Sequence, residues 1–215
     1  MKLPRIRTAA VAIALLLAVY LPAFALTSLL RPTLQVAIAL IICISLCLAL
    51  AIIAWLSRRG RGFAAFGFAL PSIRSMVLAL GFGLPLALGA AWLASAFPSP
   101  APFNVASLQR WQQVLFFLVA TPVQEEVIFR GLVQSVLQER WSEALAIRGA
   151  QLSLAVICTA VLFAIVHLGS GWATVVGALV LSVLAGELRT RSGSLLPAVV
   201  VHSLFNVAAM FVPSA

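Results

Sequence analysis

The chain has 215 residues, of which 63% are hydrophobic and only 9% are charged. A water-soluble globular domain carries roughly 45–50% apolar and about 25% charged residues, so this composition excludes one and indicates an integral membrane protein. The charged side chains are 14 basic and 5 acidic, which gives a net charge of +9. Because the basic residues fall between hydrophobic runs, they act as topology signals facing anionic lipid and do not indicate a nucleic-acid partner.

The hydrophobic runs predict an all-α, polytopic transmembrane bundle. A bilayer core about 30 Å thick requires about 20 apolar residues per helix. Seven runs meet this length, at roughly residues 8–30, 33–56, 75–97, 111–137, 151–168, 172–188 and 194–212. We expect one integral membrane domain with an N-terminal region, residues 1–110, that holds three spans, and a second region, residues 111–212, that holds four. No internal repeat is visible, which gives an inverted-repeat transporter no support.

The distribution of Lys and Arg predicts a cytoplasmic N-terminus for a multi-pass protein of the cell membrane. Arg31 and Arg110 fall on one side of the predicted spans, and Arg130 lies within a span. The other side, predicted to be cytoplasmic, carries Lys2, Arg5, Arg7, Arg58, Arg59, Arg61, Arg74, Arg140, Arg148, Arg189 and Arg191. An alternative is that residues 1–25 form a signal peptide ending in Ala-Phe-Ala, whose cleavage would leave six spans and change no direction.

Three ionisable residues lie within the fourth span. A charge at the centre of a bilayer costs about 2.5–3.5 kcal/mol, so such residues are functional candidates. Glu126 and Arg130 are four residues apart with the acid first, which predicts an ion pair on one helix face. Glu125 lies about 140° away from Arg130 around the helix and needs another partner or a function. Pro122 predicts a kink that frees a backbone carbonyl near Leu118.

The only two histidines of the chain also lie in predicted spans. His167 ends the fifth span. His202 and Asn206 lie four residues apart in the seventh span and therefore share a helix face, with Pro197 just upstream as a second expected kink. A Glu, two His and an Asn on three separate helices predict one polar pocket inside the bundle.

This set of side chains fits the hydrolysis of an amide bond. Partial burial raises the pKa of a carboxyl group toward neutrality, which suits a Glu beside a His to activate water as a general base. A second His and an Asn amide can donate hydrogen bonds to the resulting oxyanion. The sequence has no GxSxG motif and no Cys beside a His, which argues against a covalent nucleophile. Two His and a Glu are also ligand types of catalytic zinc, so a zinc site remains the alternative.

The three motifs together resemble a known family. Glu-Glu-x-x-x-Arg at residues 125–130, Phe-x-x-x-His at 163–167 and His-x-x-x-Asn at 202–206 are similar to the motifs of the CAAX protease and bacteriocin-processing family. These are intramembrane glutamic endopeptidases related to the Rce1-type prenyl proteases. The resemblance covers residues 111–210 and extends to Arg-Ser-Gly-Ser-Leu at residues 191–195. It implies that Glu125 is the general base, that His167 helps to activate the water, and that His202 and Asn206 hold the oxyanion.

The resemblance also implies supporting roles and a substrate class. Glu126 and Arg130 would brace the catalytic helix, and Phe163 would pack beside the water. The family implies hydrolysis without a metal or other cofactor, acting on prenylated tails, leader peptides or membrane-proximal segments. The partners expected are therefore membrane lipid and a membrane-associated peptide or protein.

The same residues fit two further functions. One is a non-catalytic bacteriocin self-immunity or scaffold protein, and the other is a proton-coupled transporter that uses Glu and His as a relay. The sequence leaves the substrate and the oligomeric state open.

Overall fold

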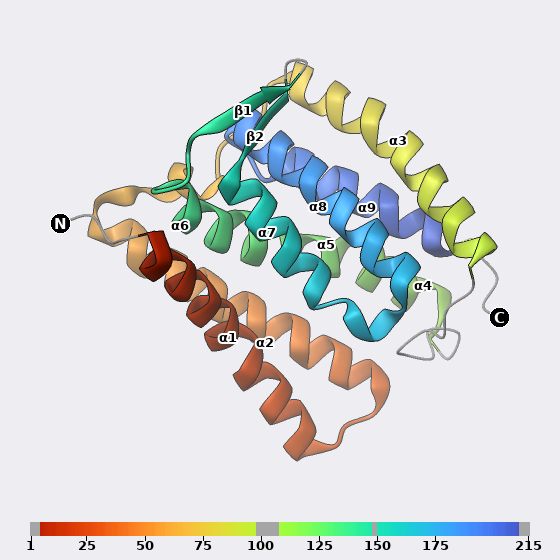
Figure 1. Ribbon diagram of the computed structural model, residues 1–215. Helices are drawn as coiled ribbons and strands as arrows, with labels where there is room; N and C mark the ends of the chain where they lie inside the picture. Colours follow the sequence, from red (N-terminus) through yellow and green to blue (C-terminus); the bar gives the residue numbers. More distant parts are fainter. Residues whose placement is uncertain (1–4, 98–107, 148–149, 211–215) are drawn as a thin grey trace.

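Helices account for nearly all of the regular structure (Figure 1). The computed structural model describes residues 5–97, 108–147 and 150–210. A central helix runs from α4 (Arg110–Gln113) through α5 (Thr121–Glu126) to α6 (Ser135–Gln138). Around it lie α1 (Arg5–Leu30), α2 (Leu34–Leu56), α3 (Ile73–Ala96), α7 (Leu154–Ile165), α8 (Trp172–Ser192) and α9 (Leu196–Met210). The all-α prediction is confirmed, and each predicted span corresponds to one of these helices.

The hydrogen bonding of the central helix changes along its length. Stretches with π-helical hydrogen bonds, Val114–Ala120 and Val127–Gln134, flank α5 on both sides. Pro122 lies in the first turn of α5, where it contributes no N–H to the helix. Every residue from Val127 to Gln134 is buried. Because π-helical turns inside a regular helix occur frequently at functional sites, the residues between these two stretches are functional candidates.

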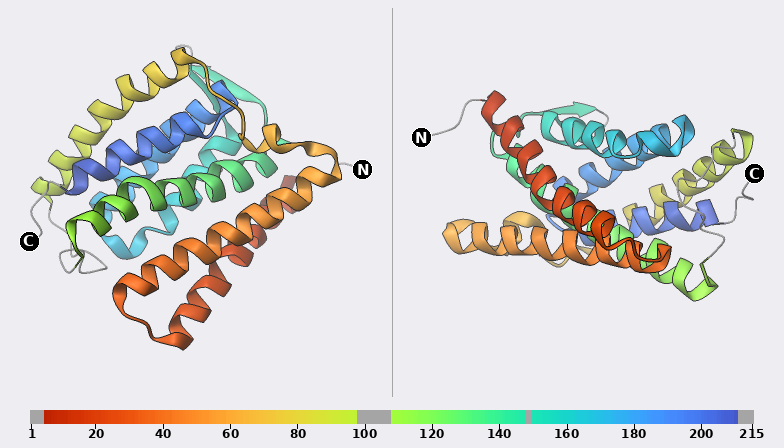
Figure 2. Two further views of the ribbon diagram at one scale, coloured as in Figure 1. Left: turned by 180° about the vertical axis from the view of Figure 1, so that it is seen from behind. Right: turned by 90° about the horizontal axis from the view of Figure 1, so that it is seen from below.

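The remaining helices pack around the central helix. α1 packs against α2, α3 against α9, and α7 against α8, while the central helix contacts α1, α2, α7 and α9. Figure 2 shows the central helix between the α1–α2 pair and the other helices. Phe129, Leu132, Phe163 and Leu181 belong to the continuous apolar core that results.

The helices differ in whether they are long enough to cross a bilayer. Four are long and apolar enough, with spans at Ile6–Leu30, Leu34–Arg61, Ile73–Leu93 and Trp172–Ser192. Leu154–Ile165 and Leu196–Val207 are apolar but shorter. The seven expected helices are therefore present, whereas seven full crossings stay a prediction.

Two local features differ from the expectations. A short antiparallel hairpin, β1 (Ala144–Ile147) and β2 (Ala150–Ser153), precedes α7, and its second strand occupies the start of the expected fifth span. α7 begins only after Ser153, whose side chain caps the helix by accepting a hydrogen bond from the backbone N–H of Val156 at 3.2 Å. Pro197 lies in the first turn of α9, where a missing N–H costs nothing, and so it starts the helix where a kink was expected.

Candidate active site in the central helix

Glu126 and Arg130 form the expected ion pair inside the central helix. The Arg130 Nη1 atom donates a hydrogen bond to Glu126 Oε1 at 2.9 Å, and both side chains are completely buried. Arg130 also lies over the ring of Phe163, with its guanidinium carbon 4.8 Å from the ring centroid. A buried charge of either sign is costly without a partner, so the two residues stabilise each other.

His202 joins α9 to both glutamates. Its Nδ1 atom lies 2.8 Å from Glu126 Oε1, and its Nε2 atom lies 3.6 Å from Glu125 Oε2. Glu126 Oε1 accepts the hydrogen bond from Arg130, and with the same oxygen as acceptor His202 donates to it from Nδ1. The Nε2 atom of His202 therefore faces Glu125. The sequence did not predict this contact between His202 and Glu126.

The two adjacent glutamates differ in exposure. The Glu125 side chain keeps 16% of its surface exposed, whereas Glu126 has none. The 3.6 Å between Glu125 and His202 is too long for a direct hydrogen bond, and a water molecule can lie within hydrogen-bonding distance of both atoms. The site thus combines a carboxyl group that is shielded from water, that of Glu126, with one that water can reach, that of Glu125.

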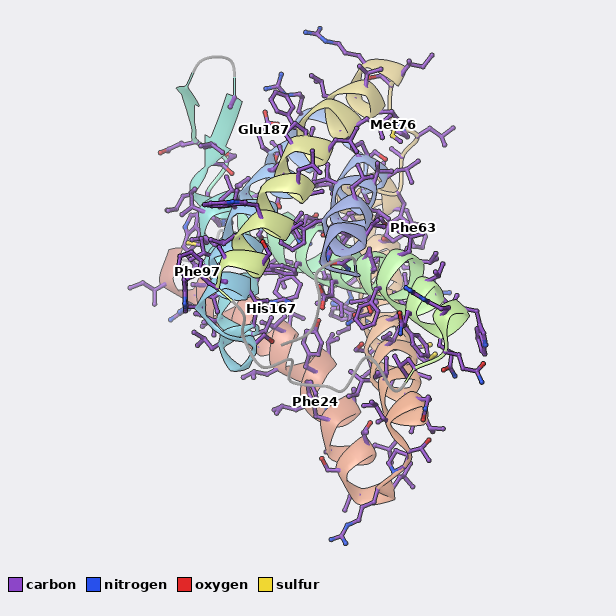
Figure 3. All side chains as sticks on the ribbon, turned by 90° about the vertical axis from the view of Figure 1, so that its right-hand side faces the viewer. Phe24, Phe63, Met76, Phe97, His167 and Glu187 are labelled. Atoms are coloured by element: carbon purple, nitrogen blue, oxygen red, sulfur yellow. The ribbon has the colours of Figure 1, made fainter. Side chains whose placement is uncertain are left out.

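Phe163 brings His167 into contact with this cluster. The Phe163 ring lies 4.6 Å from the His167 ring and meets the His202 ring edge-on at 5.7 Å, centroid to centroid. The Nδ1 atom of His167 lies 2.7 Å from the Phe163 carbonyl oxygen. Since a carbonyl only accepts, His167 carries its hydrogen on Nδ1, which leaves the Nε2 lone pair available. His167 lies toward the same end of the bundle as Phe97, the residue that follows α3 (Figure 3).

Asn206 and Ser203 bind two adjacent carbonyl groups in the π-helical stretch before Pro122. Asn206 Nδ2 donates to the Phe117 carbonyl at 2.9 Å, and Ser203 Oγ donates to the Leu118 carbonyl at 2.7 Å. Residue 122 would supply the N–H for Phe117 in a π-helical turn and for Leu118 in an α-helical turn. Pro122 has no N–H, so α9 satisfies both groups. The freed carbonyl expected near Leu118 is present, and Asn206 keeps a second amide hydrogen.

A second polar group supports α5 from the N-terminal helices. Gln124 Nε2 donates to Tyr20 Oη on α1 at 3.1 Å and to Ser45 Oγ on α2 at 3.0 Å. Sequence reasoning missed Gln124, Tyr20 and Ser203. The signals were a Gln directly before the glutamate pair, the only Tyr of the chain, and a Ser directly after His202.

The described part of the chain contains no group of three or more His, Cys, Asp or Glu side chains placed to hold a metal ion. Among the three nearest candidates, Glu126 is hydrogen-bonded to His202 and Arg130, and Glu125 lies 3.6 Å from His202 on the other side of the imidazole. These contacts place Glu125, Glu126, Arg130 and His202 in one cluster, with His167 attached through Phe163 and Asn206 one turn further along α9.

A bundle of apolar helices around a buried Glu–Arg–His cluster defines a class: a helical membrane protein with a polar site at its centre. Residues 107–208 match a protein family described as Rce1-like, type II CAAX prenyl endopeptidase Rce1-like. The C-terminal half of the chain is therefore an Rce1-like domain, as its three motifs predicted. No curated protein and no solved structure matches the chain. The family match supports a membrane protease, and it covers the whole central helix, α7, α8 and most of α9.

Proposed function

We propose that the protein is an intramembrane endopeptidase that hydrolyses peptide bonds with a water molecule activated by Glu125. The contrast between the adjacent glutamates carries this proposal. Glu126 is fully buried and accepts hydrogen bonds from Arg130 and His202. Glu125 is partly exposed and lies opposite His202 Nε2. Only Glu125 combines access to water with an imidazole across from it.

In the proposed reaction Glu125 removes a proton from the water while its oxygen attacks the carbonyl carbon of the substrate. The Nε2 lone pair of His167 accepts a hydrogen bond from the second O–H of the water, which stays intact, and so orients the water. The developing oxyanion receives hydrogen bonds from a protonated His202 and from the second amide hydrogen of Asn206, and losing one such donor costs about 2.7–4 kcal/mol. The C–N bond then breaks, and Glu125 returns its proton to the leaving amine.

The supporting residues keep this arrangement electrically balanced and correctly oriented. Glu126 and Arg130 balance each other's charge, which lowers the cost of burying both among apolar helices. Glu126 holds the His202 ring through Nδ1, so that Nε2 points toward Glu125. Phe163 packs between the two imidazole rings.

The substrate class follows from the site's position among apolar helices and from the family match. A peptide reaching this cluster must enter a bundle of four membrane-length helices and two shorter apolar ones. The Rce1-like family is described as a CAAX prenyl endopeptidase. We therefore place prenylated tails, leader peptides and other membrane-proximal peptides in the substrate class, with the cell membrane as the location.

Cleavage of a membrane-peptide library by the purified protein in detergent tests this function. The library contains leader peptides and prenylated C-terminal peptides, and mass spectrometry identifies the products. We expect cleavage by the wild type and by Glu143→Ala, a matched carboxyl deletion on an exposed residue beyond the central helix, and none by Glu125→Ala. A zinc chelator should leave the rate unchanged. If Glu125→Ala cleaved peptides at the wild-type rate, Glu125 would not be the general base. Inhibition by the chelator would favour a zinc mechanism.

A further inference from the structure

A cavity of about 330 Å³ lies apart from the catalytic cluster, between α1, α2 and the C-terminal end of the central helix. Its volume falls in the usual range for small-molecule sites, about 300–1,000 Å³. The residues of the Glu125 cluster do not line it. Its walls divide into a charged mouth and an apolar inner end.

The end of the cavity away from this mouth is apolar. It lies between α1 and α2, which face lipid. Val11 and Leu15 of α1 and Ile52 of α2 line it. From the level of Thr8 to that of Leu15 the α1 wall extends about 10 Å, at 1.5 Å per residue. Val11 is itself 39% exposed, so the apolar wall continues onto the outer surface of the bundle. A hydrocarbon chain can therefore pass from the bilayer into the cavity.

The mouth of the cavity carries excess positive charge. Arg61, Glu139 and Arg140 line it, and Arg61 forms an ion pair with Glu139. The Arg140 side chain has no hydrogen-bond or ion-pair partner among the residues that the structure describes, although it is half-buried. Arg59 adds a further cation at this rim, 4.2 Å above the ring of Trp55, which also lines the cavity. An anion is needed to balance Arg140.

We propose that this cavity binds one anionic glycerophospholipid, with the phosphate group at Arg140 and Arg61 and one acyl chain along Val11, Leu15 and Ile52. A lipid without a phosphate group would leave Arg140 without a counter-ion, and a zwitterionic head group would bring a further cation beside Arg61 and Arg140. A peptide segment would leave backbone N–H and C=O groups unpaired against the apolar wall. Basic pockets between transmembrane helices on the cytoplasmic side bind anionic head groups, and the mouth lies on the side where the basic residues predict the cytoplasm.

This site links lipid composition to the catalytic helix. Val136, Glu139 and Arg140 at the cavity continue the helix that carries Glu125, whereas Val11 and Ile52 belong to α1 and α2. A bound lipid would hold the α1–α2 pair against the C-terminal end of this helix. It would therefore raise the thermal stability of the protein whether or not the protein cleaves peptides.

Native mass spectrometry and thermal unfolding in detergent test the proposal without an activity assay. The probes are dioleoyl phosphatidylglycerol, dioleoyl phosphatidylcholine and glycerol 3-phosphate. We expect the wild type to retain phosphatidylglycerol selectively and to unfold at a higher temperature with it. Arg140→Gln should weaken this binding about fivefold, the effect of one basic residue near an anionic lipid. Arg110→Gln, an exposed arginine at the opposite end of the central helix, should not.

A second pair of variants tests the acyl-chain end and does not change the charge. Val11→Trp fills the inner end and should reduce binding of phosphatidylglycerol, whereas Leu17→Trp, on an exposed position of α1, should leave it unchanged. Equal retention of phosphatidylcholine, or wild-type binding in both Arg140→Gln and Val11→Trp, would overturn the proposal. Competition by glycerol 3-phosphate at the same concentrations would assign the site to a free phosphate compound and overturn the lipid assignment.

Discussion

At the scale of single residues, burial separates two glutamates that are neighbours in the chain. Glu126 is closed off by Arg130 and His202, and its charge is neutralised within the protein. Glu125 faces the other edge of the same imidazole and keeps contact with water. Glu126 is therefore suited to a structural role and Glu125 to a role in the reaction. The two roles predict different effects of substitution on stability and on activity.

The first prediction concerns the stability of the Glu126–Arg130 pair. Glu126→Gln removes the charge that balances a completely buried Arg130, and breaking a buried pair costs about 3–5 kcal/mol. Thermal and denaturant unfolding in detergent should show a large decrease in the free energy of unfolding. Glu139→Gln is the control, because the ion pair of Glu139 with Arg61 is at the surface, with 48% and 24% of the two side chains exposed, and its loss should cost about 1 kcal/mol or less. Equal losses in both variants would contradict the supporting role.

At the scale of elements, local contacts could be predicted from the sequence and contacts between helices could not. The Glu126–Arg130 pair follows from a spacing of four residues, and the freed Leu118 carbonyl follows from Pro122. The contact of His202 with Glu126 joins residues 76 apart, and it depends on how far α9 slides along the central helix. Nothing in a single sequence gives that register. Seven hydrophobic runs likewise predicted seven helices but not the hairpin that shortens α7.

The segment between α2 and α3 provides a second prediction, which concerns how tightly it packs against α8 and the turn that precedes α9. Gly67 has φ 90°, and its backbone carbonyl accepts a hydrogen bond from the Leu195 N–H at 2.9 Å. A Cβ atom at Gly67 would lie 2.5 Å from Arg189 Nε and 2.8 Å from Leu195 Cγ. Arg189 cannot move away freely, because its Nη2 atom donates to the Ala65 carbonyl at 2.9 Å.

Gly67→Ala should therefore lower the free energy of unfolding by about 2–4 kcal/mol, through a strained backbone and a steric clash. Gly193→Ala is the control, because Gly193 has φ 69° and ψ 5°, in the same left-handed region as Gly67, but no atom within 4 Å of the added Cβ, and only a backbone strain of about 1 kcal/mol applies. Denaturant titration of both variants measures the difference. Equal destabilisation would show that the segment is not packed against Arg189 and Leu195.

At the scale of the whole molecule, the charges lie asymmetrically along the bundle. Arg61 pairs with Glu139 at the end of the central helix, and Arg189 near the end of α8 reaches the Ala65 carbonyl, so these basic residues gather at one end. Met76 in α3 and Glu187 in α8 lie toward that end, away from Phe97 and His167 (Figure 3). Arg31 follows the C-terminal end of α1, and Arg110 begins the central helix, so both lie at the other end of the bundle. The positive-inside rule therefore predicts that the Arg61 end lies in the cytoplasm.

Labelling of introduced cysteines checks this orientation. Ser142→Cys lies beyond the predicted cytoplasmic end of the central helix, and Thr33→Cys lies between α1 and α2 at the opposite end; both positions are exposed. In intact cells a membrane-impermeant maleimide should label Thr33→Cys and not Ser142→Cys, with the native cysteines replaced by alanine. Both should react after the cells are opened. The reverse pattern would invert the proposed topology.

The most direct test of the proposed function is the single-turnover cleavage rate of Glu125→Gln, measured together with its unfolding temperature. Loss of a general base slows a reaction by about 10²–10⁴-fold. We predict a loss of this size with a nearly unchanged unfolding temperature, because Glu125 is partly exposed and makes no direct hydrogen bond within the part of the chain that the structure describes. A folded Glu125→Gln protein that cleaves at the wild-type rate would contradict the proposed mechanism.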